Sequence, residues 1–521
     1  MLIETIFLLL LVIIMAGLIM GKRGVRTAYI WMLLTFISFI AWLILILIPY
    51  EKAAPLILGN WFVYGDSNVN LRFVFNSQTW ILAISLLGFN LSFLLTNIAR
   101  LNIKIDLKNW IFQLALTMFS FLAVLAGDLW TVVLIWTLLD ILDIAYHHIH
   151  NKERISYFKK ARIKFLASML LIWNISVLSN TVVNPILNGV VTISNSTLFL
   201  SALLHSGVFP FEKETKLYSK NDSSKLLDLS FKVTNFIVSF ALIYSLPAPD
   251  LSFFLEIFLT IILHVVIIFS FIQWVVRTNL ENSLNYFLLG EAGLFSLIYL
   301  SGGSNYLIYM LAILPLSVMW LGLFSHSGKG LMVFPIIGSL FISGLPLSLN
   351  TIGPRAFMGS GFLLNQLLTL TAQILFLLGF INHALQKKEE LEFLEKWYQA
   401  IYLIGLFVPL ITIFRIVSRS FTSFAVEIKF WWVGVLVVAL TLLGIVFLKR
   451  NNNFGIIIES RLNREIVFIW KVFTLDWLFE LAQLLKVQTK SVVNGISKLL
   501  EGEGGILWAI VLLLLVFSVL R

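Results

Sequence analysis

Long uninterrupted apolar runs are the feature that most constrains this chain. They begin with residues 2–21 and 28–49 and recur to the C-terminal end. A helix of about 20 apolar residues spans the hydrocarbon core of a bilayer, so the sequence predicts an all-α polytopic membrane protein with about sixteen transmembrane helices. Composition agrees, because 59% of the residues are hydrophobic and 12% are charged, against roughly 45–50% and ~25% in water-soluble domains.

The basic residues predict an orientation. Most of the 37 lysines and arginines fall in alternate loops, such as 100–108 and 152–164, and Lys164 is counted with them. Cytoplasmic loops are rich in Lys and Arg, so these loops are assigned to the inside and both termini to the outer side of the cell inner (plasma) membrane. Arg415, Arg419 and Lys429 then fall on the wrong side. The net charge of +10 is typical of such inner loops, and no nucleic-acid partner is expected.

Several classes of chemistry are excluded or unsupported. The chain has no cysteine, which excludes disulfides, thiolate metal sites and iron–sulfur ligation. It has no phosphate-binding glycine loop and no supported Ser/His/Asp arrangement. We therefore expect neither a cofactor nor a metal, and at most a non-catalytic membrane subunit of a larger enzyme.

One segment near the C-terminus is too polar to cross a membrane. Residues 461–504 carry apolar side chains at helical spacing, which predicts an amphipathic lateral helix of about 60 Å at ~1.5 Å per residue. It is either a surface helix on its own protein or a strap that contacts neighbouring subunits. The predicted domains are a transmembrane domain at 1–450, this cytoplasmic-side segment within 451–504, and a final transmembrane helix at 505–521.

A break interrupts the apolar pattern near residues 205–212. The run that starts near residue 193 meets His205, Gly207 and Pro210, and the next run already contains Asp228 and Lys232. Proline and glycine break a helix, and bilayers tolerate the break only where protein or water covers it. Ionisable groups at that depth are costly and indicate a functional site. Asp228 and Lys232, four residues apart, either pair with each other or take part in ion transfer.

Other ionisable residues lie inside predicted spans. Asp140 and Asp143 are three residues apart and share a helix face, so one of them should hold a proton or a cation. Asp143 also has a simpler interpretation, as a solvated residue near the cytoplasmic end. His264 and Glu291 are either relay groups or satisfied polar groups of the core. His147, His148 and His150 suggest a metal cluster by composition, although a proton-collecting surface fits them better.

Five motifs in a fixed order carry a resemblance to a known family. They are GNWFVYGDSNVNLRFVFNSQTWILAI (59–84), GDLWTVVLIWTLLDILD (127–143), LHSGVFP (204–210), LENSLNYFLLGEAG (280–293) and GLP (344–346). Together they resemble the antiporter-like subunits of respiratory complex I and of Mrp-type sodium/proton antiporters. The resemblance implies a second broken helix near 344–356. It also implies other membrane subunits as partners, contacted partly through the lateral helix.

The chain departs from the family at the ion-carrying positions. The family's fifth-helix glutamate is replaced by Thr137, with Asp140 three residues on, and its seventh-helix lysine is replaced by His205. Histidine titrates close to neutral pH, so His205 could replace a lysine as a proton carrier; alternatively it caps the broken helix. An eighth-helix lysine of some members appears one turn away as Lys232, which could switch between Asp228 and His205.

Two further departures concern the second half of the chain. Ser317 stands where the family has an eleventh-helix lysine, and Arg355 lies one position beyond a twelfth-helix lysine. Arginine keeps its charge, so Arg355 would block or tune an exit rather than carry a proton. Asn76 stands where an aspartate is usual.

The resemblance implies a subunit that translocates ions, most simply protons or else sodium, within a complex I-like or Mrp-like assembly. The expected ion-translocation residues are Asp140, Asp143, His205, Asp228, Lys232, His264, Glu291 and Arg355. Two alternatives stay open: a degenerate scaffold subunit that docks partners without conducting ions, and a membrane subunit of an inorganic-carbon accumulating complex. The transport hypothesis requires that His205, Lys232 and Asp140 gather halfway through the membrane.

Overall fold

The computed structural model describes residues 2–48, 51, 54–64, 67–100, 107–149, 154–181, 188–208, 222–243, 253–277, 280–300, 304–323, 331, 333–345, 348, 363–386, 395–425, 431–450 and 476–501. The chain divides into two units, and every described helix and strand except the last belongs to the larger one. That last helix, α18 (Asp476–Glu501), lies within the predicted lateral segment and is amphipathic. The exposed large apolar side chains of α18 are Trp477, Leu481, Leu484, Leu485 and Val487.

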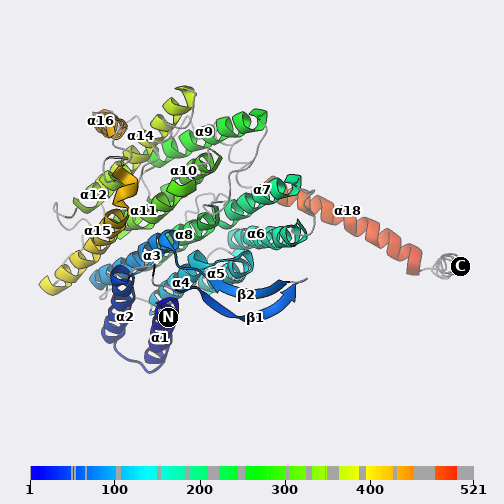
Figure 1. Ribbon diagram of the computed structural model, residues 1–521, viewed down its shortest axis with the longest axis horizontal. Coiled ribbons are helices and arrows are strands. Elements are labelled where there is room, and N and C mark those ends of the chain that lie inside the picture. The colour runs from blue at the N-terminus through cyan, green and yellow to red at the C-terminus, as the bar shows by residue number, and fades with distance from the viewer. Residues whose placement is uncertain are drawn as a thin grey trace. The chain divides into compact units, whose positions relative to one another are not determined.

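Helices dominate the larger unit (Figure 1). They are α1 (Leu2–Lys22), α2 (Thr27–Leu47), α3 (Ser77–Thr96), α4 (Leu107–Leu125), α5 (Leu129–Ile149), α6 (Arg154–Thr181), α7 (Asn188–His205), α8 (Asp222–Ile243), α9 (Phe253–Val276), α10 (Leu280–Leu300), α11 (Ser304–Leu323), α12 (Val333–Ile342), α14 (Leu363–Leu385), α15 (Lys396–Ala425) and α16 (Trp431–Arg450). Among the described helices, nine are long and apolar enough to cross a membrane. The chain is therefore a multi-pass, all-α membrane protein, as predicted.

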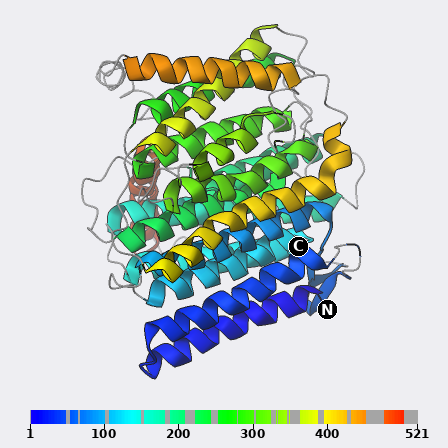
Figure 2. The same cartoon turned by 90° about the vertical axis from the view of Figure 1, so that its left-hand side faces the viewer.

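The long helices of this unit lie side by side, with α1 and α2 at one edge and α16 at the opposite edge (Figure 2). Segments far apart in sequence pack together, because α15 lies along α3. Small residues permit this contact, since a Cβ on Gly405 of α15 would lie 2.9 Å from a side-chain carbon of Thr96. Close backbone approach of this kind is typical of membrane helix interfaces.

A short hairpin precedes α3 and holds the start of α5. Strand β1 (Leu56–Tyr64) pairs antiparallel with β2 (Ser67–Phe73). The end of the hairpin bonds to the α4–α5 connection, because Gly127 N donates to the Arg72 carbonyl at 2.7 Å. Asp128 then caps α5 by accepting from the Thr131 backbone N–H at 2.7 Å, which satisfies a free donor of the first turn. The hairpin therefore fixes where α5 enters the bundle.

Asn76 caps α3. Its side-chain oxygen accepts from the backbone N–H groups of Gln78 and Thr79, and Thr79 Oγ1 accepts from the Asn76 N–H in a capping box. Asparagine and aspartate are equally good N-caps. The departure from the family's aspartate at this position therefore preserves the local structure.

Two closed rings of five helices make up most of the larger unit. In the first ring α4 packs on α5, α5 on α6, α6 on α7, α7 on α8 and α8 on α4. In the second ring the same order runs through α9, α10, α11, α12 and α14, and the two rings meet where α8 contacts α10 and α11. The chain thus repeats one arrangement twice, a repeat that is not readable by eye in the sequence.

The fourth helix of each ring ends in the same way. Helix α7 ends at His205, α12 ends at Ile342, and the following Ser-Gly pairs place Gly207 at φ 75° and Gly344 at φ 76°. Glycine is favoured there because other L-residues rarely adopt positive φ. Both predicted breaks therefore begin where expected. The rest of each predicted break, including Arg355, lies outside the described residues.

Arg415 and Arg419, on the wrong side by the orientation rule, have structural partners. Arg415 donates from Nε and Nη2 to the carbonyl of Ile46 near the end of α2, at 3.2 and 3.0 Å. Arg419 pairs with Glu51 at 3.2 Å, and its guanidinium carbon lies 5.6 Å from the centre of the Trp80 ring. A cation near the last carbonyls of a helix is stabilising. Packing thus explains these two residues better than orientation does.

Candidate ion-translocation site

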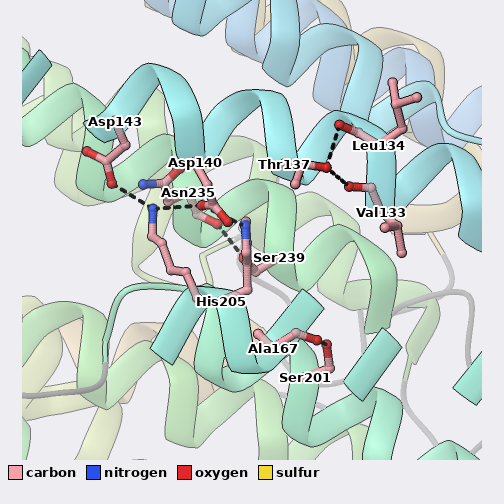
Figure 3. Close-up of polar contacts among 11 residues, drawn as sticks. Val133, Leu134, Thr137, Asp140, Asp143, Ala167, Ser201, His205, Asn235 and Ser239 are labelled. Atoms are coloured by element: carbon pink, nitrogen blue, oxygen red, sulfur yellow. Dashed lines mark hydrogen bonds and ion pairs between the residues drawn. The ribbon is translucent and has the colours of Figure 1, made fainter. Parts of the chain in front are cut away.

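Helix α5 directs one face that carries ionisable side chains into the first ring. Trp136, Asp140, Asp143 and His147 are spaced by four, three and four residues, so they lie along the same side of the helix. Thr137 is exposed, and its hydroxyl bonds to backbone carbonyls of its own helix (Figure 3). The first carboxylate on this face is Asp140, three residues beyond the position at which the family resemblance places a glutamate, and Asp143 follows it.

Lys164 of α6 lies between the two aspartates. Its Nζ is 2.7 Å from Asp143 Oδ2 and 3.4 Å from Asp140 Oδ1, and the residue is 5% exposed. The expectation that Lys164 belongs to a cytoplasmic loop is wrong, because α6 begins ten residues earlier and carries Lys164 into the bundle. The simple interpretation of Asp143 as a solvated residue is also wrong, since it is 7% exposed and doubly paired.

His205 closes the cluster from α7. Its Nε2 lies 3.3 Å from Asp140 Oδ1, its Nδ1 lies 2.8 Å from Ser239 Oγ of α8, and the side chain is fully buried (Figure 3). The ring of Trp136 stacks on the imidazole at 3.9 Å with an interplanar angle of 10°. His205 is thus held on three sides, by a carboxylate, a hydroxyl and an aromatic face.

The hydrogen bonds around His205 determine where its protons are. Ser239 donates its single hydroxyl hydrogen to the Asn235 carbonyl at 2.7 Å, because a carbonyl can only accept. The Ser239 oxygen must then accept from His205, so Nδ1 carries a hydrogen. Nε2 faces Asp140 Oδ1, and neither atom has a regular hydrogen bond to another described residue. One proton between them converts two facing lone pairs into an attractive contact.

Formal charge supports the same count. We define the charged cluster as Asp140, Asp143, Lys164 and His205. Two carboxylates against one ammonium leave a charge of −1, and one more proton on the Asp140–His205 pair brings the cluster to zero. Buried charge is expensive unless it is compensated, so a proton on the Asp140–His205 pair would make the charged cluster neutral.

A polar face of α8 extends from the cluster. Asp228, Lys232, Asn235 and Ser239 are spaced by four, three and four residues along one side of the helix. Asp228 accepts from the Tyr146 hydroxyl at 2.7 Å, and Lys232 donates to Asn285 Oδ1 of α10 at 2.9 Å. Of the three residues expected to gather, Asp140 and His205 are in contact. The cation that lies between the aspartates is Lys164, whereas Lys232 reaches toward the second ring.

The remaining predicted residues lie elsewhere. His264 of α9 donates from Nδ1 to the Thr260 carbonyl at 2.7 Å, as a satisfied core histidine would. Glu291 of α10 is 3% exposed, and its Oε1 has no hydrogen-bond partner among the described residues. His147 lies 3.2 Å from Asp143, and His148 is exposed. His150 lies outside the described residues, as does Arg355.

Sequence reasoning missed His383 of α14. This fully buried side chain contacts the Trp274 carbonyl through Nε2 at 3.0 Å and packs against the Trp274 ring at 4.1 Å. Its place near the end of an apolar run gave it no signal beyond its residue type. Because its ring nitrogens are used by a backbone carbonyl and by Gln386 at 3.3 Å, the contacts indicate a structural role.

Solved structures with the same fold exist, although no protein-family model and no curated protein matches the sequence. A chain of the Mrp complex from Dietzia sp. DQ12-45-1b aligns with all of this chain at a TM-score of 0.68 and 12% identity. This chain spans 63% of that one. A chain of the membrane-bound sulfane sulfur reductase, an archaeal respiratory membrane complex, aligns with 78% of this chain and 75% of its own at 0.56 and 13% identity.

A chain of respiratory complex I from Thermus thermophilus gives a similar result. It aligns with 78% of this chain and 97% of its own, at a TM-score of 0.55 and 12% identity. At such identities the likeness concerns the fold alone. The resemblance to antiporter-like membrane subunits, first noted from five sequence motifs, is confirmed at that level.

Proposed function

We propose that this chain is a proton-translocating subunit of a multi-subunit membrane complex. The observation that carries the proposal is the buried contact between His205 and Asp140 at the end of a broken helix, 3.3 Å apart. A proton arriving at Nε2 of His205 forms the imidazolium–carboxylate pair. Its departure leaves a neutral imidazole and a carboxylate, which Lys164 compensates in part. No other bond is made or broken, and the same proton that enters leaves.

The polar interior of the first ring supports this role. Each of its five helices contributes at least one buried polar atom that has no hydrogen-bond partner among the described residues; examples are atoms of Gln113, Asp140, Ser168, His205 and Asn235. An unsatisfied buried polar group costs about 1–3 kcal/mol. Several such groups in one ring are costly in a dry interior. They suit one that water enters, because water satisfies several such groups at once.

A path toward the second ring follows from Lys232. The polar face of α8 leads from Ser239 past Asn235 to Lys232, and Lys232 contacts Asn285 of α10. Lys232 is half-buried, so its ammonium acts between the two rings. We propose that Lys232 couples the proton of the charged cluster to titratable groups of the second ring. Glu291 is the candidate there, because it is a buried carboxyl group on α10.

Proton flux into liposomes tests the proposal. The purified full-length chain would be reconstituted with a pH-sensitive dye inside, and a potassium diffusion potential would drive uptake. Asp140→Asn and Lys232→Ala should abolish the flux while leaving the protein folded by size-exclusion chromatography. Thr137→Val, an exposed change on the same helix, should leave it unchanged. A wild-type flux that both variants retain would contradict the proposal.

A scaffold subunit is the second candidate. One observation favours it: Ile342 ends α12 where His205 ends α7, and α16 packs directly on this second break. A Cβ on Gly434 of α16 would lie 2.4 Å from the Gly344 carbonyl oxygen. On this reading Asp140→Asn and Lys232→Ala would both be silent in every transport assay.

A further inference from the structure

We propose that Lys164 makes the charged cluster selective for protons against sodium, because its ammonium occupies the place between the two aspartates where an alkali cation would bind. This inference rests on the proposed function, in that it names the ion the site exchanges. It concerns a residue that the family motifs do not include.

Three of the four oxygens of the aspartate pair face nitrogen. Asp143 Oδ2 lies 2.7 Å from Lys164 Nζ, Asp143 Oδ1 lies 3.2 Å from His147 Nε2, and Asp140 Oδ1 lies between Lys164 at 3.4 Å and His205 at 3.3 Å. Hard cations are held by several oxygen ligands at once. Nitrogen groups that carry hydrogens or positive charge at these positions remove the ligands and add repulsion.

The ammonium is also difficult to displace. Lys164 is 5% exposed and sits on α6, a 28-residue helix packed on both α5 and α7. A tethered cation competes with a free one as an intramolecular partner, at an effective concentration that a dissolved ion does not match. Sodium would therefore have to displace an ammonium that already pairs with both aspartates.

A proton is not subject to this competition. It needs a lone pair rather than a coordination shell, and the gap between His205 Nε2 and Asp140 Oδ1 provides one. The titratable groups in contact within the cluster are Asp140, Asp143 and His147 of α5, Lys164 of α6 and His205 of α7. Helix α8 contacts His205 through the neutral Ser239. The charged residues on that face of α8, Asp228 and Lys232, bond instead to Tyr146 and to Asn285. With Lys164 in place, the remaining charge of −1 on the charged cluster is neutralised by a proton rather than by a sodium ion.

Sodium binding tests the inference without relying on transport. Equilibrium binding of ²²Na⁺ to the purified full-length protein in detergent would be measured at pH 8, with choline holding ionic strength constant. Wild type, Lys164→Arg and the exposed control Lys396→Met should bind no sodium above background. Lys164→Met, which keeps the apolar stem and removes the charge, should bind about one ion per chain, saturably and in competition with protons as pH falls.

Thermal unfolding gives a second, independent readout of sodium binding. Bound sodium raises the thermal midpoint in proportion to the logarithm of its concentration, so Lys164→Met should gain a sodium-dependent rise in its midpoint that wild type lacks. Saturable sodium binding to wild type would overturn the inference, and so would a folded Lys164→Met protein that binds none. If Lys164→Met does not fold, Lys164→Gln, which also removes the charge, takes its place in both measurements. Loss of proton flux in wild type, with the sodium results as expected, would refute the proposed function and leave this inference standing.

Discussion

Removing Lys164 should expose how strongly the charged cluster depends on charge balance. Its ammonium is 2.7 Å from Asp143 Oδ2, and the two side chains are 6% and 9% exposed. Breaking a buried ion pair by removing one partner costs about 3–5 kcal/mol, because the remaining charge is left uncompensated. We therefore expect Lys164→Met to lower the free energy of unfolding by about 3–5 kcal/mol. The same change at exposed Lys396 should stay within about 0.5 kcal/mol.

A double-mutant cycle separates this effect from simple loss of packing. Asp143→Asn leaves Lys164 beside Asp140 at 3.4 Å, and it should cost about 1–3 kcal/mol. The double variant carries neither charge, so it should be more stable than the sum of the single changes predicts, by about 2–3 kcal/mol. Reversible unfolding by dodecyl sulfate (SDS replaced by its Tris salt, so that no sodium is present) in mixed micelles, followed by circular dichroism, measures all four proteins. Additivity within about 0.5 kcal/mol would refute the reasoning.

Three further changes test other parts of the molecule. Asn76→Ala should lower stability by about 1 kcal/mol in the same dodecyl sulfate assay, whereas Asn76→Asp should not, and equal losses would contradict the cap. Gly434→Ala should cost about 1–3 kcal/mol, since its Cβ would lie 2.4 Å from the backbone of Gly344; Gly444→Ala, which meets a flexible leucine, should cost less. Trp136→Leu should lower proton flux by about 2–10-fold through loss of the His205 stack, and Trp136→Phe should restore most of it.

Hydropathy predicted the architecture because the bilayer allows little else. Spans of about 20 apolar residues must be helical, and the order of five motifs added the fold. Asp140, Asp143 and His205 were predictable for the same reason, since ionisable groups stand out in apolar runs. What they contact was not, because hydropathy carries no information on which helices are neighbours.

Lys164 shows why part of the site could not be predicted. Lys164 ends the basic stretch ARIK (161–164), which the orientation rule assigns to a cytoplasmic loop. Its burial depends on ion pairs with aspartates of another helix, α5. One signal was available. Helices α5 and α6 are consecutive and joined by a short connection, so Asp143 and Lys164, each two to three turns from it, are placed side by side in an antiparallel pair. Helix α5 contains two aspartates and no lysine or arginine, which indicates that a basic residue of a neighbouring helix pairs with them.

A comparison of the two rings shows that a helix can break in the same way with or without an ionisable residue at the break. Ser206 and Ser343 each donate to the carbonyl three residues earlier, at 2.6 and 2.7 Å, and each accepts from the N–H two residues later at 3.4 Å. The same local bonds therefore end both helices, with or without a charge. The residue before the serine differs, being His205 in the first ring and Ile342 in the second. A break alone gives a site for a side chain, and the charged cluster exists only where α5 and α6 supply partners for that side chain.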